Sequence, residues 1–267
     1  MSVAARAESL VERSRKPRPR PEYLCELLFY PLAHLVVRAL LPLRVPPPAV
    51  LLAGAAAGIA GAVEIGRGDL VLAALLLQLK TVLDNADGQL ARAAGRVSAL
   101  GRYLDTESDL VVNAVILAAL GYLVDGPWLA AAAFVCLTIV LGADFNLVRL
   151  YRRERGETDV PPPGAPAVLE RIYGLFFVPQ DRLVEGLAEA RLRRLRADAR
   201  ARLSYHDAGT LSVLANLGLS SQLAVLGLCL VLDVPSAYLW VAVGCGAALP
   251  VLELRRELRA RSTVSAR

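Results

Sequence analysis

Long blocks of Leu, Ala and Val, separated by short charged segments, are the dominant pattern of the 267-residue chain. Four uncharged blocks are each close to the roughly 20 residues that a helix needs to cross a membrane: Val45–Val63, Gly126–Ala143, Ala208–Leu232 and Val234–Leu252. Two shorter blocks reach that length if their helices continue into the charged stretch between them, over Asp69–Arg92 and Ala99–Val124. The pattern predicts six transmembrane helices, two of which carry carboxylates at one end.

Composition favours helices over a transmembrane barrel. Hydrophobic residues make up 55% of the chain, more than the 45–50% that is usual for soluble domains. Aromatic residues account for only 6%, which leaves little material for the aromatic girdles of a β-barrel. We therefore expect an all-α integral membrane protein, in which each helix satisfies its own backbone polar groups.

The distribution of Lys and Arg predicts the orientation. The loops at positions 64–69, 124–128 and 232–236 are short and contain a single arginine. Nearly all other basic residues lie in the N-terminal tail, in Ala91–Arg102, in Arg149–Arg202 and after Glu253. The positive-inside rule places these segments, and therefore both termini, on the cytoplasmic side of the cell membrane.

Two segments are predicted to be helical without crossing the membrane. Glu22–Arg44 is amphipathic, and Glu26 and Pro31 favour an interfacial helix bent at the proline over a seventh span. Between spans 4 and 5, the Pro-rich stretch Val160–Pro166 is expected to be a linker. The helical pattern after it places these apolar residues on one face: Ala188, Leu192, Leu195, Ala199 and Leu203.

An arginine-rich face lies opposite those apolar residues. This favours a helix lying on an anionic membrane surface, although a helix packed on the domain fits the same pattern. The expected organisation is a cytosolic tail and interfacial helix over 1–44, a membrane domain over 45–254 that includes a cytosolic basic segment at 151–207, and a tail over 255–267.

Four aspartates gather between the second and third predicted spans: Asp84, Asp87, Asp105 and Asp109. The first two share a helix face, and so do the last two. If the two antiparallel helices pack together, the four carboxylates converge near the cytoplasmic boundary. Four neighbouring carboxylates cannot all remain ionised without cations close by. Ion pairs with Lys80 and Arg92 would offset only a small part of their repulsion. The oxygen-rich cluster favours Mg²⁺ or Mn²⁺, and two ions would suit its charge and a diphosphate substrate.

Neighbouring residues extend this candidate site. Small residues at Gly88, Ala91 and Gly101 allow close approach of a ligand or backbone, and Arg92 can bind a phosphate oxygen. Further polar residues lie at or near membrane depth, where such groups are candidates for function: Asn113, Asp144, Asn146, Arg149 and Arg152. The arginines would suit a phosphorylated ligand, and they equally suit anchoring to lipid headgroups.

Written out, the charged stretch is D-x2-D-G-x2-A-R-x8-G-x3-D-x3-D, filled by Asp84, Asp87, Gly88, Ala91, Arg92, Gly101, Asp105 and Asp109. It resembles the signature of the CDP-alcohol phosphotransferases, integral membrane enzymes of phospholipid synthesis. The resemblance implies a six-helix domain, often dimeric, with a polar site open to the cytoplasm. It also implies transfer of a phospho-alcohol group from a CDP-linked donor, commonly CDP-diacylglycerol, to an acceptor hydroxyl, with release of CMP.

The resemblance also implies roles for residues. The four aspartates would hold two divalent ions, and Asp109 would in addition take the proton of the acceptor. Gly88, Ala91, Arg92 and Gly101 would form the site of the CDP-linked donor, with Ser98 a further candidate. The polar residues at membrane depth, from Asn113 to Arg152, would be the candidates for binding the acceptor, and the arginines among them would suit a phosphorylated acceptor such as an inositol phosphate or glycerol phosphate. The expected partners are a membrane lipid, a small alcohol or phospho-alcohol and a second copy of the chain, with no nucleic acid.

Other functions are compatible with aspartates beside a membrane. A membrane prenyltransferase also binds a metal-bound diphosphate, but two well separated aspartate motifs would be expected. A cation transporter would carry charges near mid-bilayer in several helices, and here only Asp144 comes close. A catalytically inactive scaffold would have no need of all four aspartates.

Overall fold

The computed structural model describes residues 10–15, 18–157 and 167–265, and all regular secondary structure within them is helical. The predicted all-α class is therefore confirmed. In chain order the elements are α1 (Leu10–Ser14), a π-helical turn η1 (Cys25–Phe29), α2 (Tyr30–Leu40), α3 (Pro47–Arg67), α4 (Leu70–Ala93), α5 (Ala99–Leu123), α6 (Pro127–Arg153), α7 (Ala167–Phe176), α8 (Val178–Arg194), α9 (Ala199–Tyr205), α10 (Ala208–Asn216), α11 (Leu219–Val231) and α12 (Pro235–Ser265).

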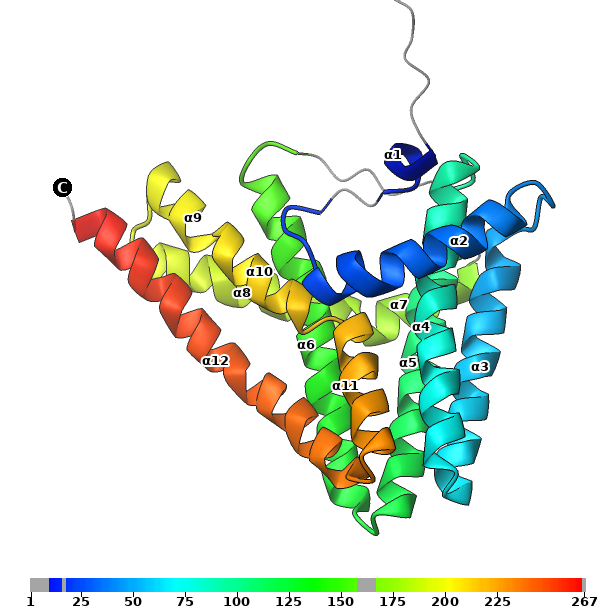
Figure 1. Cartoon of the computed structure of the whole chain (residues 1–267). Helices are drawn as coiled ribbons and strands as arrows, with labels where there is room; N and C mark the ends of the chain where they lie inside the picture. Colours follow the sequence, from blue (N-terminus) through cyan, green and yellow to red (C-terminus); the bar gives the residue numbers. More distant parts are fainter. Residues whose placement is uncertain (1–9, 16–17, 158–166, 266–267) are drawn as a thin grey trace, which may run out of the picture.

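The long helices form a bundle in which α3, α4, α5, α6 and α11 run side by side and α12 is inclined to them (Figure 1). Helix α2 and the α4–α5 turn lie at one end, and the α3–α4, α5–α6 and α11–α12 turns lie at the other. Among the described residues, five segments are long and apolar enough to cross a membrane: Pro47–Arg67, Ala99–Leu123, Pro127–Arg153, Ala199–Val231 and Pro235–Val264.

These segments agree with an integral membrane protein, whereas the sixth predicted crossing stays a prediction. It corresponds to α4, which is 24 residues long and packs along α3 and α11. Its second half carries Lys80, Asp84 and Asp87, which lower its apolarity. These charged residues explain why α4, which bears two of the four aspartates, is not among the five segments.

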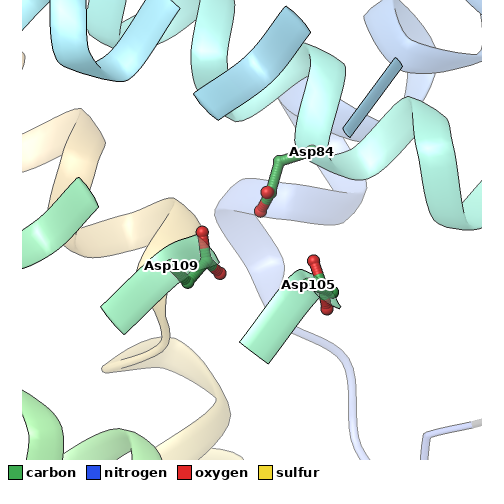
Figure 2. A group of neighbouring side chains, drawn as sticks. All are labelled: Asp84, Asp105 and Asp109. Atoms are coloured by element: carbon green, nitrogen blue, oxygen red, sulfur yellow. The ribbon is translucent and has the colours of Figure 1, made fainter. Parts of the chain in front are cut away.

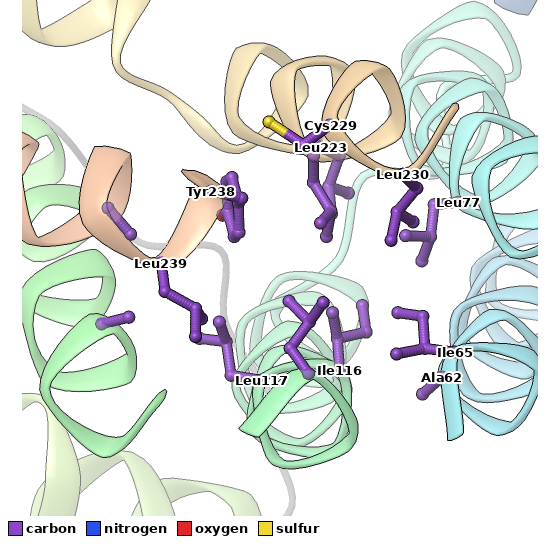
Figure 3. Packing of buried hydrophobic residues seen from close by; sticks show 14 of the residues in the cluster. Ala62, Ile65, Leu77, Ile116, Leu117, Leu223, Cys229, Leu230, Tyr238 and Leu239 are labelled. Carbon is purple, nitrogen blue, oxygen red and sulfur yellow. The ribbon is translucent and has the colours of Figure 1, made fainter. Parts of the chain in front are cut away.

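The main core lies between α3, α4, α5, α6, α11 and α12 (Figure 3). Its centre contains fully buried aliphatic side chains such as Ile65, Leu77 and Leu120. Glycines bring α3 close to its neighbours, because a Cβ atom at Gly61 would lie 3.0 Å from Leu77 Cδ2 and one at Gly58 would lie 2.5 Å from Val112 Cγ1. The close packing of α3 fixes the relative position of α4 and α5, which carry the aspartates.

The predicted fifth span, Ala208–Leu232, is not one continuous helix. Helix α10 ends at Asn216 and α11 begins at Leu219, with extended backbone at Gly218. A Cβ atom at Gly218 would lie 2.9 Å from the carbonyl oxygen of Ala215, so the close turn requires glycine. The segment remains long and apolar enough to cross a membrane, and the break within it was not predicted, because uncharged composition alone does not show a break of this kind.

The predicted N-terminal helix is present, and its proline explains its shape. Pro31 has no backbone N–H, and the preceding turn is π-helical, with the N–H of Tyr30 donating to the carbonyl of Cys25. Helix α2 then lies across the end of the bundle (Figure 1), where its Ala33 and Val37 are buried together with Leu90. Its place at a membrane interface remains a prediction.

The predicted helix in the basic segment is divided into α8 and α9 by a turn over residues 195–198, in which Arg196 has φ of 49°. Ala188 and Leu192 are buried in a core cluster with Leu147 and Leu214. The part of the apolar face that lies on α8 therefore packs on the protein, as in the alternative interpretation, whereas Ala199 and Leu203 on α9 are exposed. Contact of this segment with the membrane surface stays a prediction. The predicted linker Val160–Pro166 lies outside the described residues, and α12 continues through most of the predicted C-terminal tail.

Candidate active site

The antiparallel packing of α4 and α5 brings three aspartates together. Asp84 of α4 points toward Asp105 and Asp109 of α5 (Figure 2), and one carboxylate oxygen from each lies within 4.8 Å of the others. Oxygens on opposite sides of one Mg²⁺ ion are roughly 4.2 Å apart. A small adjustment of the side chains would therefore bring all three carboxylates around a single divalent ion.

Asp87 lies next to this cluster on α4. Its side chain is only 7% exposed, and its Oδ2 atom is buried without a hydrogen-bond partner among the described residues. A buried carboxylate oxygen without a partner is energetically costly. This oxygen fits a cation near Asp87, whereas the group whose ligand atoms lie close enough to share one ion comprises Asp84, Asp105 and Asp109.

Lys80 contacts two of these aspartates from within the bundle. Its side chain is 1% exposed, and its Nζ atom lies 2.6 Å from Asp109 Oδ1 and 3.3 Å from Asp84 Oδ1. The ammonium group therefore joins the carboxylates of the two helices. From the sequence, Lys80 was expected to provide only a modest ion pair with the cluster.

The aspartates border a cavity of about 700 Å³, which is also lined by Gly88 and Arg92. The guanidinium of Arg92 lies over Gly88, where a Cβ atom would be 3.2 Å from Nη1. Its Nε atom donates to the carbonyl of Ser14 at 2.7 Å. Gly88 thus gives the arginine room to fold along α4, and the N-terminal segment holds it there.

The other three residues expected at the site of the CDP-linked donor do not line this cavity: Ala91, Ser98 and Gly101. Ser98 is the N-cap of α5, and its Oγ accepts a hydrogen bond from the backbone N–H of Gly101 at 3.1 Å. In this structure the pair defines where α5 begins, and so sets the register of Asp105 and Asp109.

Of the acceptor candidates, Asn113, Asp144 and Arg149 line the cavity, and Asn146 and Arg152 do not. The buried Nδ2 of Asn146 donates to Asp181 Oδ1 at 2.8 Å, which joins α6 to α8. Arg152 lies 3.7 Å from Glu157. These last two residues therefore contribute to packing and to surface charge.

Three segments that were not expected at the site also line the cavity. The first is N-terminal and includes Arg18, Glu22 and Tyr30, the second comprises the α7–α8 turn with Gln180 and Asp181, and the third is the α10–α11 turn at residues 218–220. The amphipathic pattern of residues 22–44 was interpreted as a helix at the membrane interface, although an apolar face can equally pack on the bundle. Nothing local in the sequence indicates that the start of α8 lines the same cavity as the aspartates.

Comparison with known proteins identifies this arrangement. The family model described as CDP-alcohol phosphatidyltransferase matches residues 42–177, just over half of the chain and including all four aspartates. The chain belongs to the CDP-alcohol phosphatidyltransferase family. The resemblance drawn from the aspartate motif is therefore confirmed at the level of the family. The prenyltransferase and transporter alternatives are accordingly set aside.

One curated relative has a short region of high similarity. It is the bifunctional IPC transferase and DIPP synthase of Thermococcus kodakarensis, which is 49% identical over 53 residues. This region covers 20% of the present chain and 12% of the relative. The N-terminal wall of the cavity, and its α8 wall from Val178 onward, lie outside the residues that match the CDP-alcohol phosphatidyltransferase family.

Proposed function

We propose that the protein transfers a phosphatidyl group from CDP-diacylglycerol, or a similar phospho-alcohol group from a related CDP-linked donor, to the hydroxyl of a small alcohol, with release of CMP, in phospholipid synthesis. The observation that carries this proposal is the convergence of Asp84, Asp105 and Asp109 on one cavity within the family signature. The membrane bundle supports a lipid donor, because its tails can remain among apolar helices while its nucleotide enters the polar cavity.

The four aspartates are the residues that would hold Mg²⁺ or Mn²⁺, because their ligand atoms are all carboxylate oxygens, which these hard ions prefer. When bound, the ions would neutralise the carboxylates and stabilise negative charge on the diphosphate. Arg92, on the same wall of the cavity, is placed to donate hydrogen bonds to phosphate oxygens.

Asp109 is the proposed general base. Its carboxylate takes the proton of the acceptor hydroxyl as the hydroxyl oxygen forms a bond to the phosphorus that carries the alcohol of the CDP-linked donor. The bond between that phosphorus and the bridging oxygen breaks, and CMP leaves with the electron pair. Lys80 holds Asp109 Oδ1, which leaves the second oxygen, Oδ2, for the proton.

The acceptor is proposed to be a phosphorylated polyol. Arg149 supports this, because it lines the cavity and its ion pairs with Asp181 and Glu185 are long, at 3.7 and 3.6 Å. We expect Arg149→Gln to raise KM for a phospho-alcohol by about 10- to 100-fold, as for loss of a charge-assisted hydrogen bond. KM for an unphosphorylated alcohol should change little.

The matched control is Arg153→Gln, one helical turn further along α6. Arg153 is exposed, pairs with Glu185 and does not line the cavity. Steady-state kinetics of CMP release should show no change in KM for this variant. Equal effects of the two substitutions would show that only general surface charge is involved, and would contradict a phosphate site at Arg149.

The proposed topology has α4 as the sixth crossing, with both termini and the cavity on the cytoplasmic side. The α4–α5 turn lies at one end of the bundle, it contains Arg96, and the cavity is lined by the parts of α4 and α5 that adjoin this turn, which supports this orientation. We expect Val97→Cys, exposed in that turn, to react with a membrane-impermeant maleimide only from the cytoplasmic side. In a background without the native cysteines, Asp125→Cys in the α5–α6 turn should react only from the opposite side, and the reverse result would overturn the topology.

The reaction itself is tested with purified full-length protein, Mg²⁺ or Mn²⁺, and radiolabelled CDP-diacylglycerol. A panel of alcohols and phospho-alcohols is offered, and CMP and labelled lipid are measured together. Equal amounts of both products with one acceptor would support the proposal. CMP release without a lipid product would indicate hydrolysis, and no reaction with any acceptor would rule out this lipid donor.

A further inference from the structure

Lys80 is placed unusually for a lysine in a membrane protein. A lysine in a transmembrane helix commonly extends its ammonium to the interface, whereas the side chain of Lys80 is almost fully buried. Its ammonium contacts Asp84 on the same helix and Asp109 on the neighbouring helix. Lys80 is therefore a fixed cation inside the acidic cluster.

The neighbouring helix provides room for this side chain. A Cβ atom at Gly58 of α3 would lie 3.2 Å from Cδ of Lys80 and 3.6 Å from Cε. The absence of a side chain at Gly58 lets the apolar stem of Lys80 pass between α3 and α5. The ammonium thus reaches Asp109 from the core side, while the carboxylates also border the cavity.

The position of this charge has two consequences. The contact of 2.6 Å with Asp109 Oδ1 fixes the orientation of that carboxylate. In addition, a positive charge within hydrogen-bond distance of two metal ligands lowers their attraction for a divalent cation, since like charges repel strongly at short range. Four carboxylates without the lysine would bind such an ion more tightly.

We propose that Lys80 is a positioning residue that orients Asp109 and weakens the affinity of the aspartate cluster for divalent cations. Weaker binding would allow the ion to bind and leave with the substrate and CMP. The role in catalysis rests on the proposed function, whereas the effect on metal affinity does not.

The test compares the wild-type protein with Lys80→Met, a substitution that keeps a flexible chain of similar length and removes the charge. Binding of Mn²⁺ to the full-length protein in detergent is titrated by electron paramagnetic resonance. We expect the variant to bind Mn²⁺ at least about tenfold more tightly. With CDP-diacylglycerol and an active acceptor, kcat should fall by about 10- to 100-fold, with little change in KM for the CDP-linked donor.

A second variant, Lys80→Gln, distinguishes the effect of Lys80 on the orientation of Asp109 from the effect of its charge. It also replaces Lys80→Met in the test if that variant does not fold. Its amide can donate a hydrogen bond to Asp109 without a positive charge, so Mn²⁺ should bind as tightly as to Lys80→Met while kcat is partly restored. Unchanged or weaker Mn²⁺ binding in both variants would overturn the effect on affinity, and an unchanged kcat would overturn the positioning role. If the wild-type protein releases no CMP, the proposed function fails, and the Mn²⁺ titration still tests the effect of the charge.

Discussion

Asp109→Asn is expected to lower kcat for CMP release by about 10²- to 10⁴-fold, the range associated with loss of a general acid or base. Asparagine has the same shape but cannot take a proton from the acceptor. It also removes one negative charge from the group of oxygens that lie within 4.8 Å of one another. Steady-state kinetics at saturating Mn²⁺ would distinguish loss of the general base from weaker metal binding. Excess Mn²⁺ restores activity that is lost through weaker metal binding, but it does not restore activity that is lost with the base.

The fold should survive this substitution. Lys80 retains Asp84 as a charged partner at 3.3 Å, and the amide oxygen of asparagine can still accept its hydrogen bond. The matched control is Asp125→Asn at the opposite end of α5, where φ is 50° and asparagine is well tolerated. Full activity of Asp109→Asn under these conditions would contradict the proposed mechanism, whereas loss of activity in both variants would indicate a general structural defect.

The sequence was most informative where spacing along one helix determines position. Asp105 and Asp109 are one turn apart, so they share a face wherever α5 lies. To bring Asp84 next to these two aspartates, α4 and α5 need only pack side by side in opposite directions. The structure places Asp84 beside Asp105 and Asp109 in this way. Ser98 could also have been interpreted locally, since a serine before an apolar helical run is a common N-cap. The family resemblance favoured a substrate contact at that position instead.

Features that depend on distant segments could not be predicted in the same way. The contact between Asn146 and Asp181 joins residues 35 positions apart, and no periodic pattern relates them. The central position of Lys80 depends on the missing side chain at Gly58, which lies on a different helix. The turn at Gly218 interrupts a stretch with no charged residue, so hydropathy could not locate it. In each case tertiary packing determines the outcome.

Segments outside the part of the chain that matches the family complete the cavity, and this suggests where acceptor preference is set. Gln180 and Asp181 of α8 face the same space as Asn113 and Arg149. In the proposed reaction the aspartates and Arg92 serve the CDP-linked donor. We therefore expect substitutions at the start of α8 to change the preferred acceptor more than they change the use of the donor.

Removal of divalent ions is expected to have the second large effect. Dialysis of the purified protein against EDTA should reduce CMP release by at least about a thousandfold, because metal ions contribute several kcal/mol of stabilisation to a developing phosphoryl charge and 1.4 kcal/mol corresponds to a factor of ten. Mg²⁺ or Mn²⁺ in excess over the chelator should restore activity. Size-exclusion chromatography of the treated protein should show an unchanged elution volume. This result would show that the activity is lost because the metal is absent and not because the protein aggregates.

Substitutions of single aspartates show whether the metal requirement of the reaction arises from the aspartate cluster. Asp87→Asn should raise the Mn²⁺ concentration needed for half-maximal activity, because Asp87 Oδ2 is buried without a hydrogen-bond partner in the described part of the chain and would gain a cation as its partner. Asp69→Asn, which replaces the N-cap of α4 at the far end of the helix with another good capping residue, should leave that concentration unchanged. Activity that persists after complete chelation would exclude the proposed role of the four aspartates. In that case Lys80 and Arg92 would be the remaining cations on α4 that could balance the charge of a diphosphate.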